Sequence, residues 1–520
     1  MAVFTPLGSG NAGEVTQDRP PSQSIMPSAL SSLALACLGL ALAFVTVPVM
    51  VGGLGLPGYG AYSIAFTVAG YGAFLDLGLG WAGLGFTAAA HARRDRETVA
   101  GVLWALLLYQ AVVGGLLLVL LGAGADRLGL WLVGPGEDAV RVAGILPIAG
   151  AWFALSGLNG VFVGVLRGVD RPGAAALVAG TALLVGVGGG ALAVSRGHGL
   201  HAAALCQLLG ALVASLVAVG ALGDLLRRVR PGELLASSAR ALRGMLGFSL
   251  WSLLGRIVQI AVLQGDKVVA ARVAGAAGLP SYVVPFNVAQ KLNFLGSAAV
   301  TAVYPVAAGR RGSPTDFHES YFRAARVVHL LTAAPAIVLV GLAPLFLHSW
   351  IGGEMAAAGA DFLRVLAVGY WLVSVGSVDA GCVEGWGRPR LTALAAVAGL
   401  GVAAVVAVVL AVTAGGLWAV TGGVAAWMAA TGLANTLVWL RVSRFPVRRL
   451  WASLLRPILE MLLLGLGLAR LVTAWVPPGP GGLVACGALG ALLVAYGFLR
   501  LFPGGERRLL LGRVASLARA

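Results

Sequence analysis

Long apolar stretches, separated by short polar segments, follow one another along almost the whole chain from residue 28 onward. A helix needs roughly 20 apolar residues to cross about 30 Å of hydrocarbon, because each residue rises about 1.5 Å. Turn residues divide the chain into about 14 stretches of this length. The pattern predicts an all-α integral membrane protein with about 14 transmembrane helices.

Composition supports this class of protein. Hydrophobic residues make up 59% of the chain and charged residues 11%, whereas a soluble domain carries about 25% charged residues. Residues 1–27 differ, because they are rich in Pro, Ser and Gly and lack the basic segment and apolar core of a signal peptide. We predict that residues 1–27 form a disordered cytoplasmic tail.

Arginines cluster in alternate loops, for example at 93–96, 167–171 and 227–243. Cytoplasmic loops of membrane proteins carry an excess of basic residues. The opposite loops and span ends hold Arg127, Arg141, Arg196 and Arg272. An even number of spans with both termini in the cytoplasm gives this split, so the net charge of +16 does not require a nucleic-acid partner.

Nothing in the loops predicts an enzyme. The four cysteines are isolated within apolar stretches and lack the spacing of a metal site: Cys37, Cys206, Cys382 and Cys486. The longest loop holds roughly 20 residues, which is too few for a folded domain. We therefore expect no catalytic residues and no bound metal.

The two halves of the chain resemble each other. Gly55-Leu-Pro57 matches Gly278-Leu-Pro280 at an offset of 223, and Arg171-Pro172 matches Arg388-Pro389 at an offset of 217. Gly199-Leu200 matches Gly416-Leu417 at the second offset as well. A unit with an even number of spans repeats in the same orientation, as in transporters built from parallel repeats. We predict two six-helix bundles (28–226 and 245–440), a cytoplasmic linker (227–244), and two extra helices with a basic cytoplasmic tail (441–520).

Polar side chains interrupt the seventh and eighth apolar stretches. On a helical wheel, five residues of the seventh stretch share an arc of roughly 100°, while Arg272 lies on the opposite face. These five are Ser252, Arg256, Gln259, Asp266 and Lys267, and the eighth stretch adds Asn287, Gln290 and Lys291. Ionisable groups within a membrane generally face a bundle interior or a wet cavity.

Three segments are similar to signatures of one family. PGYGAYSIAFTVAGYGAFLDLGLG (57–80) resembles its second span, GVLRGVDRP (164–172) its turn between the fourth and fifth spans, and QGDKVVAARVAGAAGLPSYVVPFNVAQKL (264–292) the start of its second half. The family is the Wzx-type polysaccharide and oligosaccharide-lipid flippases of the multidrug/oligosaccharidyl-lipid/polysaccharide (MOP) exporter superfamily. The resemblance implies export of an undecaprenyl-diphosphate-linked glycan by alternating access in the bacterial cytoplasmic (inner) membrane. Its implied partners are this glycan lipid, membrane lipids and glycan assembly enzymes.

Arg256, Lys267 and Lys291 are the candidates for attracting the lipid diphosphate, because a lysine ammonium is a mobile point charge. Ser252, Gln259, Asn287 and Gln290 would complete a polar lining. The alternative is a structural ion pair with snorkelling near the helix end. Asp266 and Asp76 are candidates for coupling to H+ or Na+, with a packing role as the alternative for Asp76, and Asp379 and Glu384 are open in the same way. No other cofactor is expected.

Other functions stay open at this point. A peptidoglycan lipid-precursor flippase and a cation-coupled multidrug antiporter belong to the same superfamily, although an antiporter for cations calls for acidic cavity residues and this chain offers more basic ones. A glycan polymerase or ligase would carry a longer outer loop than the segment at roughly 123–141. A membrane scaffold of cell-envelope glycan assembly is the alternative without transport.

Overall fold

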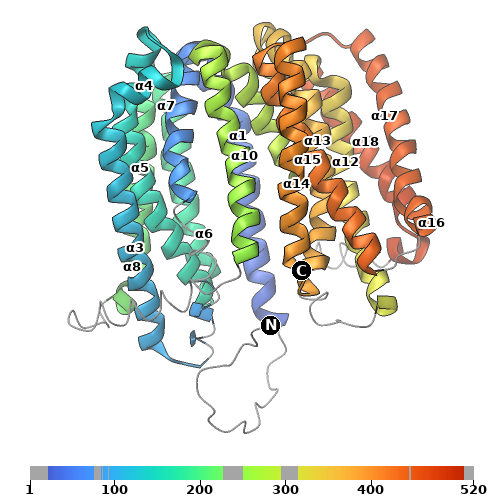
Figure 1. Ribbon diagram of the computed structural model, residues 1–520, viewed down its shortest axis with the longest axis horizontal. Coiled ribbons are helices and arrows are strands. Elements are labelled where there is room, and N and C mark those ends of the chain that lie inside the picture. The colour runs from blue at the N-terminus through green and yellow to red at the C-terminus, as the bar shows by residue number, and fades with distance from the viewer. Residues whose placement is uncertain are drawn as a thin grey trace.

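The computed structural model describes residues 22–74, 93–226, 250–293, 314–443 and 447–508, with a few single positions between 84 and 91. The secondary structure within these ranges is helical, and most of the long helices run side by side (Figure 1). Eleven helices of this part of the chain are long and apolar enough to cross a membrane. The chain is a multi-pass helical membrane protein with about 14 transmembrane helices, as the apolar pattern predicts.

The two halves of the chain contain corresponding helices. The first half consists of α1 (Ser22–Gly70), η1 (Tyr71–Phe74), α3 (Arg96–Ala123), α4 (Ala125–Val133), α5 (Glu137–Gly168), α6 (Pro172–Thr181), η2 (Ala182–Gly188), α7 (Gly189–Ser195) and α8 (Leu200–Leu226). The second half consists of α10 (Leu250–Gly278), helical residues 280–293, α12 (Pro314–Trp350), α13 (Gly353–Gly385), α14 (Pro389–Thr413) and α15 (Gly416–Ser443). The remainder forms α16 (Val447–Leu450), η4 (Trp451–Leu455), α17 (Arg456–Trp475) and α18 (Pro480–Leu501).

A glycine with positive φ divides the first helix of each half into two spans. Gly55 in α1 has φ 69° and ψ 170°, and Gly275 in α10 has φ 66° and ψ −178°. Glycine adopts such angles without a steric penalty. Gly55 therefore corresponds to Gly275, at an offset of 220, and its predicted match with Gly278 is wrong by three residues. The sequence alignment followed the shared Leu-Pro letters, which lie at different distances from the two kinks.

The Arg-Pro position of the repeat recurs at the predicted offset of 217. Arg171 (φ −115°, ψ 58°) precedes α6 and Arg388 (φ −117°, ψ 46°) precedes α14, and each is followed by a proline in the first helical turn. Proline costs no helical hydrogen bond there, because the first amides of a helix have no partner within the helix. The fifth span of each half therefore begins with the same backbone conformation at an Arg-Pro pair.

The predicted domain boundaries at 27/28 and 440/441 fall within helices α1 and α15. Helix α1 already begins at Ser22, inside the segment predicted as a tail. The predicted linker at 227–244 lies outside the described residues. The division of the chain at these boundaries stays a prediction.

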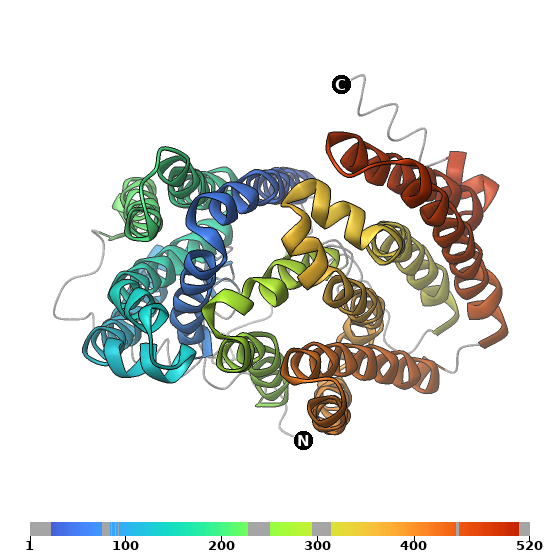
Figure 2. The same cartoon turned by 90° about the horizontal axis from the view of Figure 1, so that it is seen from above.

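Seen from above, the two halves lie side by side with α1 and α10 between them (Figure 2). Helices α17 and α18 pack against α12 at the outer edge of the second half. Apolar side chains of α14 point outward, with Val405 66% and Val412 84% exposed, as expected for a surface in contact with lipid. We call the two ends of the bundle the Ser22 end, where α1 begins and α18 finishes, and the Gly55 end, where α1 kinks.

Candidate functional site

The two halves touch at the Gly55 end. A Cβ built on Gly60, just beyond the kink of α1, would lie 1.8 Å from the carbonyl oxygen of Ala276 in α10. The two backbones therefore approach as closely as only glycine allows. Nearby, Nη1 of Arg272 in α10 donates to the carbonyl oxygen of Trp131 in α4, at 2.5 Å. Arg272 thus belongs to the contact between the halves and not to the polar stripe, as its position on the wheel indicates.

A third contact between the halves involves the last residue of α12. Nε1 of Trp350 donates to the carbonyl oxygen of Phe44 in α1 at 2.7 Å. The rings of Phe44 and Trp350 also stack, with centroids 5.4 Å apart and an interplanar angle of 18°. Together with Gly60 and Arg272, this contact closes the space between the halves at the Gly55 end.

Asp266 and Lys267 of α10 form a buried ion pair below this closed end. Nζ of Lys267 lies 3.2 Å from Oδ1 of Asp266, and their side chains are 7% and 1% exposed. The ammonium also donates to the carbonyl oxygen of Leu263 at 2.6 Å and lies 3.8 Å from the ring centroid of Phe286. The hydroxyl of Tyr282 donates to the other carboxylate oxygen of Asp266 at 2.5 Å. Each charge therefore has several partners.

The kink at Gly275 explains how these partners meet. It reverses the chain, so that Tyr282 and Phe286 in the helix after the kink lie beside Asp266 and Lys267 in the helix before it. Breaking such a pair leaves an uncompensated buried charge, which is strongly destabilising. In this conformation the ammonium of Lys267 is bound to Asp266 within the protein, as in the alternative reading of Lys267 as part of a structural ion pair. Its contact with a substrate stays a prediction.

The three predicted cations lie at two depths. Lys267 lies eight residues before Gly275 and Arg256 nineteen residues before it, or ~12 Å and ~28 Å along α10 at about 1.5 Å per residue. Lys291 lies sixteen residues after Gly275, ~24 Å along the next helix. Arg256 and Lys291 therefore share a level nearer the Ser22 end, whereas Lys267 lies deeper.

The polar residues predicted to line the site are only partly brought together. Gln259 and Lys291 are exposed, while Asn287 and Gln290 are half-buried. Asn287 lies within hydrogen-bonding reach of Tyr59 in α1, so it belongs to the face between the halves. The side chains of Ser252 and Arg256 are outside the described residues, as is the whole of Asp76.

Aromatic residues after each kink were missed by the sequence analysis. Tyr62 and Phe66 follow Gly55 with the spacing at which Tyr282 and Phe286 follow Gly275, again at an offset of 220. Nε2 of Gln207 in α8 donates to the hydroxyl of Tyr62 at 2.6 Å. In the second half, the corresponding hydroxyl of Tyr282 donates to the carboxylate of Asp266 instead. The recurring Tyr-x-x-x-Phe was the sequence signal that could have revealed both pairs and corrected the alignment.

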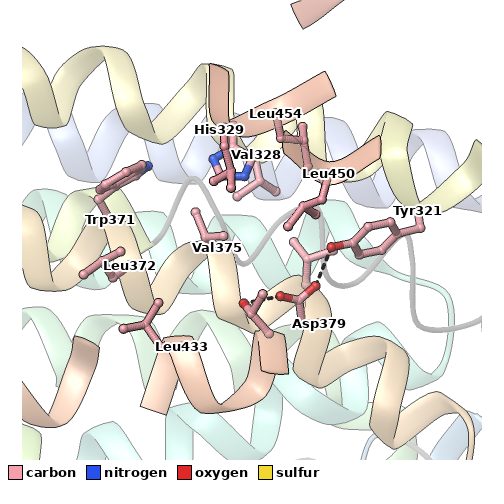
Figure 3. A pocket seen from close by; sticks show the side chains of 14 residues that line it. Tyr321, Val328, His329, Trp371, Leu372, Val375, Asp379, Leu433, Leu450 and Leu454 are labelled. Atoms are coloured by element: carbon pink, nitrogen blue, oxygen red, sulfur yellow. Dashed lines mark hydrogen bonds between the residues drawn. The ribbon is translucent and has the colours of Figure 1, made fainter. Parts of the chain in front are cut away.

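A second polar cluster lies within the C-terminal half (Figure 3). Asp379 of α13 is 1% exposed and accepts hydrogen bonds from the hydroxyls of Tyr321, at 2.7 Å, and Thr436, at 2.5 Å. A mainly apolar cavity of about 100 Å³ adjoins the carboxylate, with His329 on its wall. Two hydroxyl donors can hold a carboxylate without a cation, so the cluster ties α12, α13 and α15 together.

Sequence comparison adds the family. The family model described as "Polysaccharide biosynthesis protein" matches residues 28–309, which is more than half of the chain. The chain belongs to this polysaccharide biosynthesis protein family. A curated relative, the "Putative O-antigen transporter" of Shigella flexneri, is 22% identical over 347 residues, covering 66% of this chain and 80% of the relative.

Members of the MOP superfamily share the fold. An inward-facing MATE family multidrug resistance transporter superposes with a TM-score of 0.63 at 19% identity, covering 80% of this chain and 98% of its own. The lipid II flippase MurJ in an inward closed conformation gives a TM-score of 0.61 at 12% identity, covering 91% and 98%. The fold implied by the resemblance to MOP exporters noted in the sequence is therefore confirmed.

Proposed function

We propose that this polysaccharide biosynthesis family protein is a flippase. Its cargo would be an undecaprenyl-diphosphate-linked oligosaccharide or a related anionic glycolipid, moved across the bacterial cytoplasmic membrane by alternating access. The observation that carries this proposal is the closure at the Gly55 end above a face with polar and basic side chains. Membership of the family and the O-antigen transporter relative support a glycan cargo.

Loading would occur from the cytoplasm, at the Ser22 end. The described arginine-rich segments at 93–96, 167–171 and 388–390 lie at this end, which supports a cytoplasmic location of both termini by the positive-inside rule. Arg256 and Lys291 share a level there, and the exposure of Lys291 suits first contact with a diphosphate. Glycan assembly enzymes on the cytoplasmic side would supply the cargo.

The deeper Asp266–Lys267 pair would act later in the cycle. A diphosphate that reaches this level competes with Asp266 for the ammonium of Lys267. The carboxylate then needs a new partner, which a proton or Na+ would provide, because an unpaired buried charge is costly. Coupling through Asp266 follows from this exchange, and Asp76 is retained as a second candidate from the sequence.

A cation-exporting antiporter is less well supported. Asp266 is the only carboxylate between residues 258 and 293, and it is already paired with Lys267 and Tyr282. A peptidoglycan precursor carries the same diphosphate chemistry as an oligosaccharide lipid, so the site does not separate these two cargoes. A surface-glycan assay does, because peptidoglycan export leaves such glycans unchanged.

The function is tested by removing the charges of Arg256 and Lys291, the two cations nearer the Ser22 end. In the source bacterium, Arg256→Gln and Lys291→Gln are each expected to lower surface glycan about tenfold at matched protein abundance, since a hydrogen bond to a charged group contributes about 1.5–3 kcal/mol. The glycan is measured by quantitative immunoblotting of whole cells. Arg196→Gln, an exposed arginine at the Gly55 end, should leave export unchanged. Wild-type glycan levels in both Arg256→Gln and Lys291→Gln would contradict the proposal.

A further inference from the structure

The cavity beside Asp379 lies between α12, α13, α15 and the α16–η4 segment (Figure 3). Its volume is about 100 Å³, and its wall is mainly apolar, with Val375 of α13 and Leu450 of α16 among the lining residues. Leu433 of α15 and Leu455 of η4 also line it and are 53% and 41% exposed. The cavity therefore reaches the outer surface of the bundle between α15 and η4.

Two polar side chains on this wall lack hydrogen-bond partners. Nε1 of Trp371 in α13 and Nδ1 of His329 in α12 are buried and have no partner among the described residues. The two rings lie edge to face with centroids 6.5 Å apart, and the indole nitrogen of Trp371 is turned toward His329 (Figure 3). A buried polar group without a partner is costly, so a group that bonds to both nitrogens would stabilise this arrangement.

Both side chains lie deep within the membrane. His329 is fifteen residues from Pro314, the first residue of α12, and Trp371 is fourteen residues from Gly385, the last residue of α13. At about 1.5 Å per residue, both lie ~21–23 Å from the Ser22 end, well inside a hydrocarbon layer about 30 Å thick. A ligand that enters between α15 and η4 is therefore soluble in lipid.

The polar groups of the wall restrict the chemistry of the ligand. The indole N–H of Trp371 can only donate, whereas a nitrogen of a neutral imidazole can accept. A hydroxyl group satisfies both, because its oxygen accepts from Trp371 and its proton is donated to His329. The carboxylate of Asp379 lines the same cavity and already accepts from Tyr321 and Thr436, so its charge disfavours an anionic ligand.

We propose that this cavity binds a small, uncharged alcohol or phenol from the bilayer, whose hydroxyl group bridges Trp371 and His329. An apolar cavity of about 150 Å³ can hold benzene, so the volume of about 100 Å³ limits the ligand to a single ring or a chain of similar size. The bound molecule would contact Leu450 and Leu454. It would thereby link α16 and η4 to α12 and α13.

The proposal is tested with the full-length protein in neutral detergent by fluorine NMR. The probes are para-fluorophenol and para-fluoroanisole, which share a fluorinated ring, but only the phenol can donate a hydrogen bond. His329→Phe removes the acceptor, so the preference for the phenol over the anisole should fall about fivefold, the effect of about one hydrogen bond. Affinity for the anisole should change little, which also shows that the variant is folded. His348→Phe, the same exchange at an exposed position of α12, should keep the wild-type preference.

A cavity-filling variant locates the site. Val375→Phe places a larger side chain in the cavity and should abolish saturable binding of both probes, whereas partition into the detergent stays the same. Saturable binding that survives Val375→Phe would overturn the proposal, as would an equal preference for the phenol in wild type and His329→Phe. Absence of saturable binding to the wild type would overturn it as well, by leaving the cavity to water. Binding of para-fluorobenzoate as tight as that of the phenol would contradict the exclusion of anions by Asp379.

Discussion

Lys267→Met is expected to lower the stability of the protein by about 3–5 kcal/mol, the usual cost of removing one partner of a buried ion pair. The carboxylate of Asp266 is 1% exposed and would keep only the hydrogen bonds from Tyr282 and from its own helix. Methionine fills a volume similar to that of the lysine stem, so the loss reports charge more than packing. The measurement is the thermal unfolding midpoint of purified protein in detergent.

The double variant Asp266→Asn/Lys267→Met is the control for this prediction. It removes both charges, so its unfolding midpoint should return close to that of the wild type, because replacing a whole buried pair is often neutral. Equal stability of Lys267→Met and the wild type would show that the ion pair is not formed in solution. Transport by the stable double variant then tests the substrate role of Lys267 separately from the fold.

This ion pair marks how far sequence reasoning reaches in a membrane protein. The apolar pattern predicted the class of fold, because lipid burial imposes length and composition on every span. The wheel correctly placed Asp266 and Lys267 together and set Arg272 apart. It could not predict the contacts of Tyr282 and Phe286 with this pair, because these residues lie beside it only through the chain reversal at Gly275. A helical wheel describes one helix and contains no information on what faces it.

The repeat was limited in a similar way. The shared Gly-Leu-Pro sequence favoured an alignment of Gly55 with Gly278. The positive φ of Gly55 and Gly275 instead aligns Gly55 with Gly275, three residues earlier. The ion pairs of Arg323 and Arg326 with Glu506 lay further from reach, because their partners are up to 183 positions apart in sequence. The positive-inside pattern accounts for Arg323 and Arg326 one by one, but only the packing of α12 against α18 brings both of them to Glu506.

Gly60→Ala is expected to weaken the closure at the Gly55 end. The added methyl group would lie 1.8 Å from the carbonyl oxygen of Ala276, and backbone cannot move aside as a flexible side chain can. Overpacking of this kind costs about 1–3 kcal/mol, and a conformational equilibrium shifts about tenfold for each 1.4 kcal/mol. The closed state would therefore lose population by roughly tenfold, and export would fall with it, since alternating access requires both states.

This change can be measured by pulsed electron paramagnetic resonance. Spin labels are placed at 196 and 413, which are exposed positions near the Gly55 end of each half. The distance between the two labels should be longer in Gly60→Ala. Cys37, Cys206, Cys382 and Cys486 are replaced by alanine beforehand. Gly52→Ala is the matched control, because its added methyl group would have no atom within 4 Å. Identical distance distributions in the two glycine variants would show that Gly60 does not hold the halves together. A shift in Gly60→Ala alone would tie the closure to one backbone contact, since both variants raise helix propensity equally.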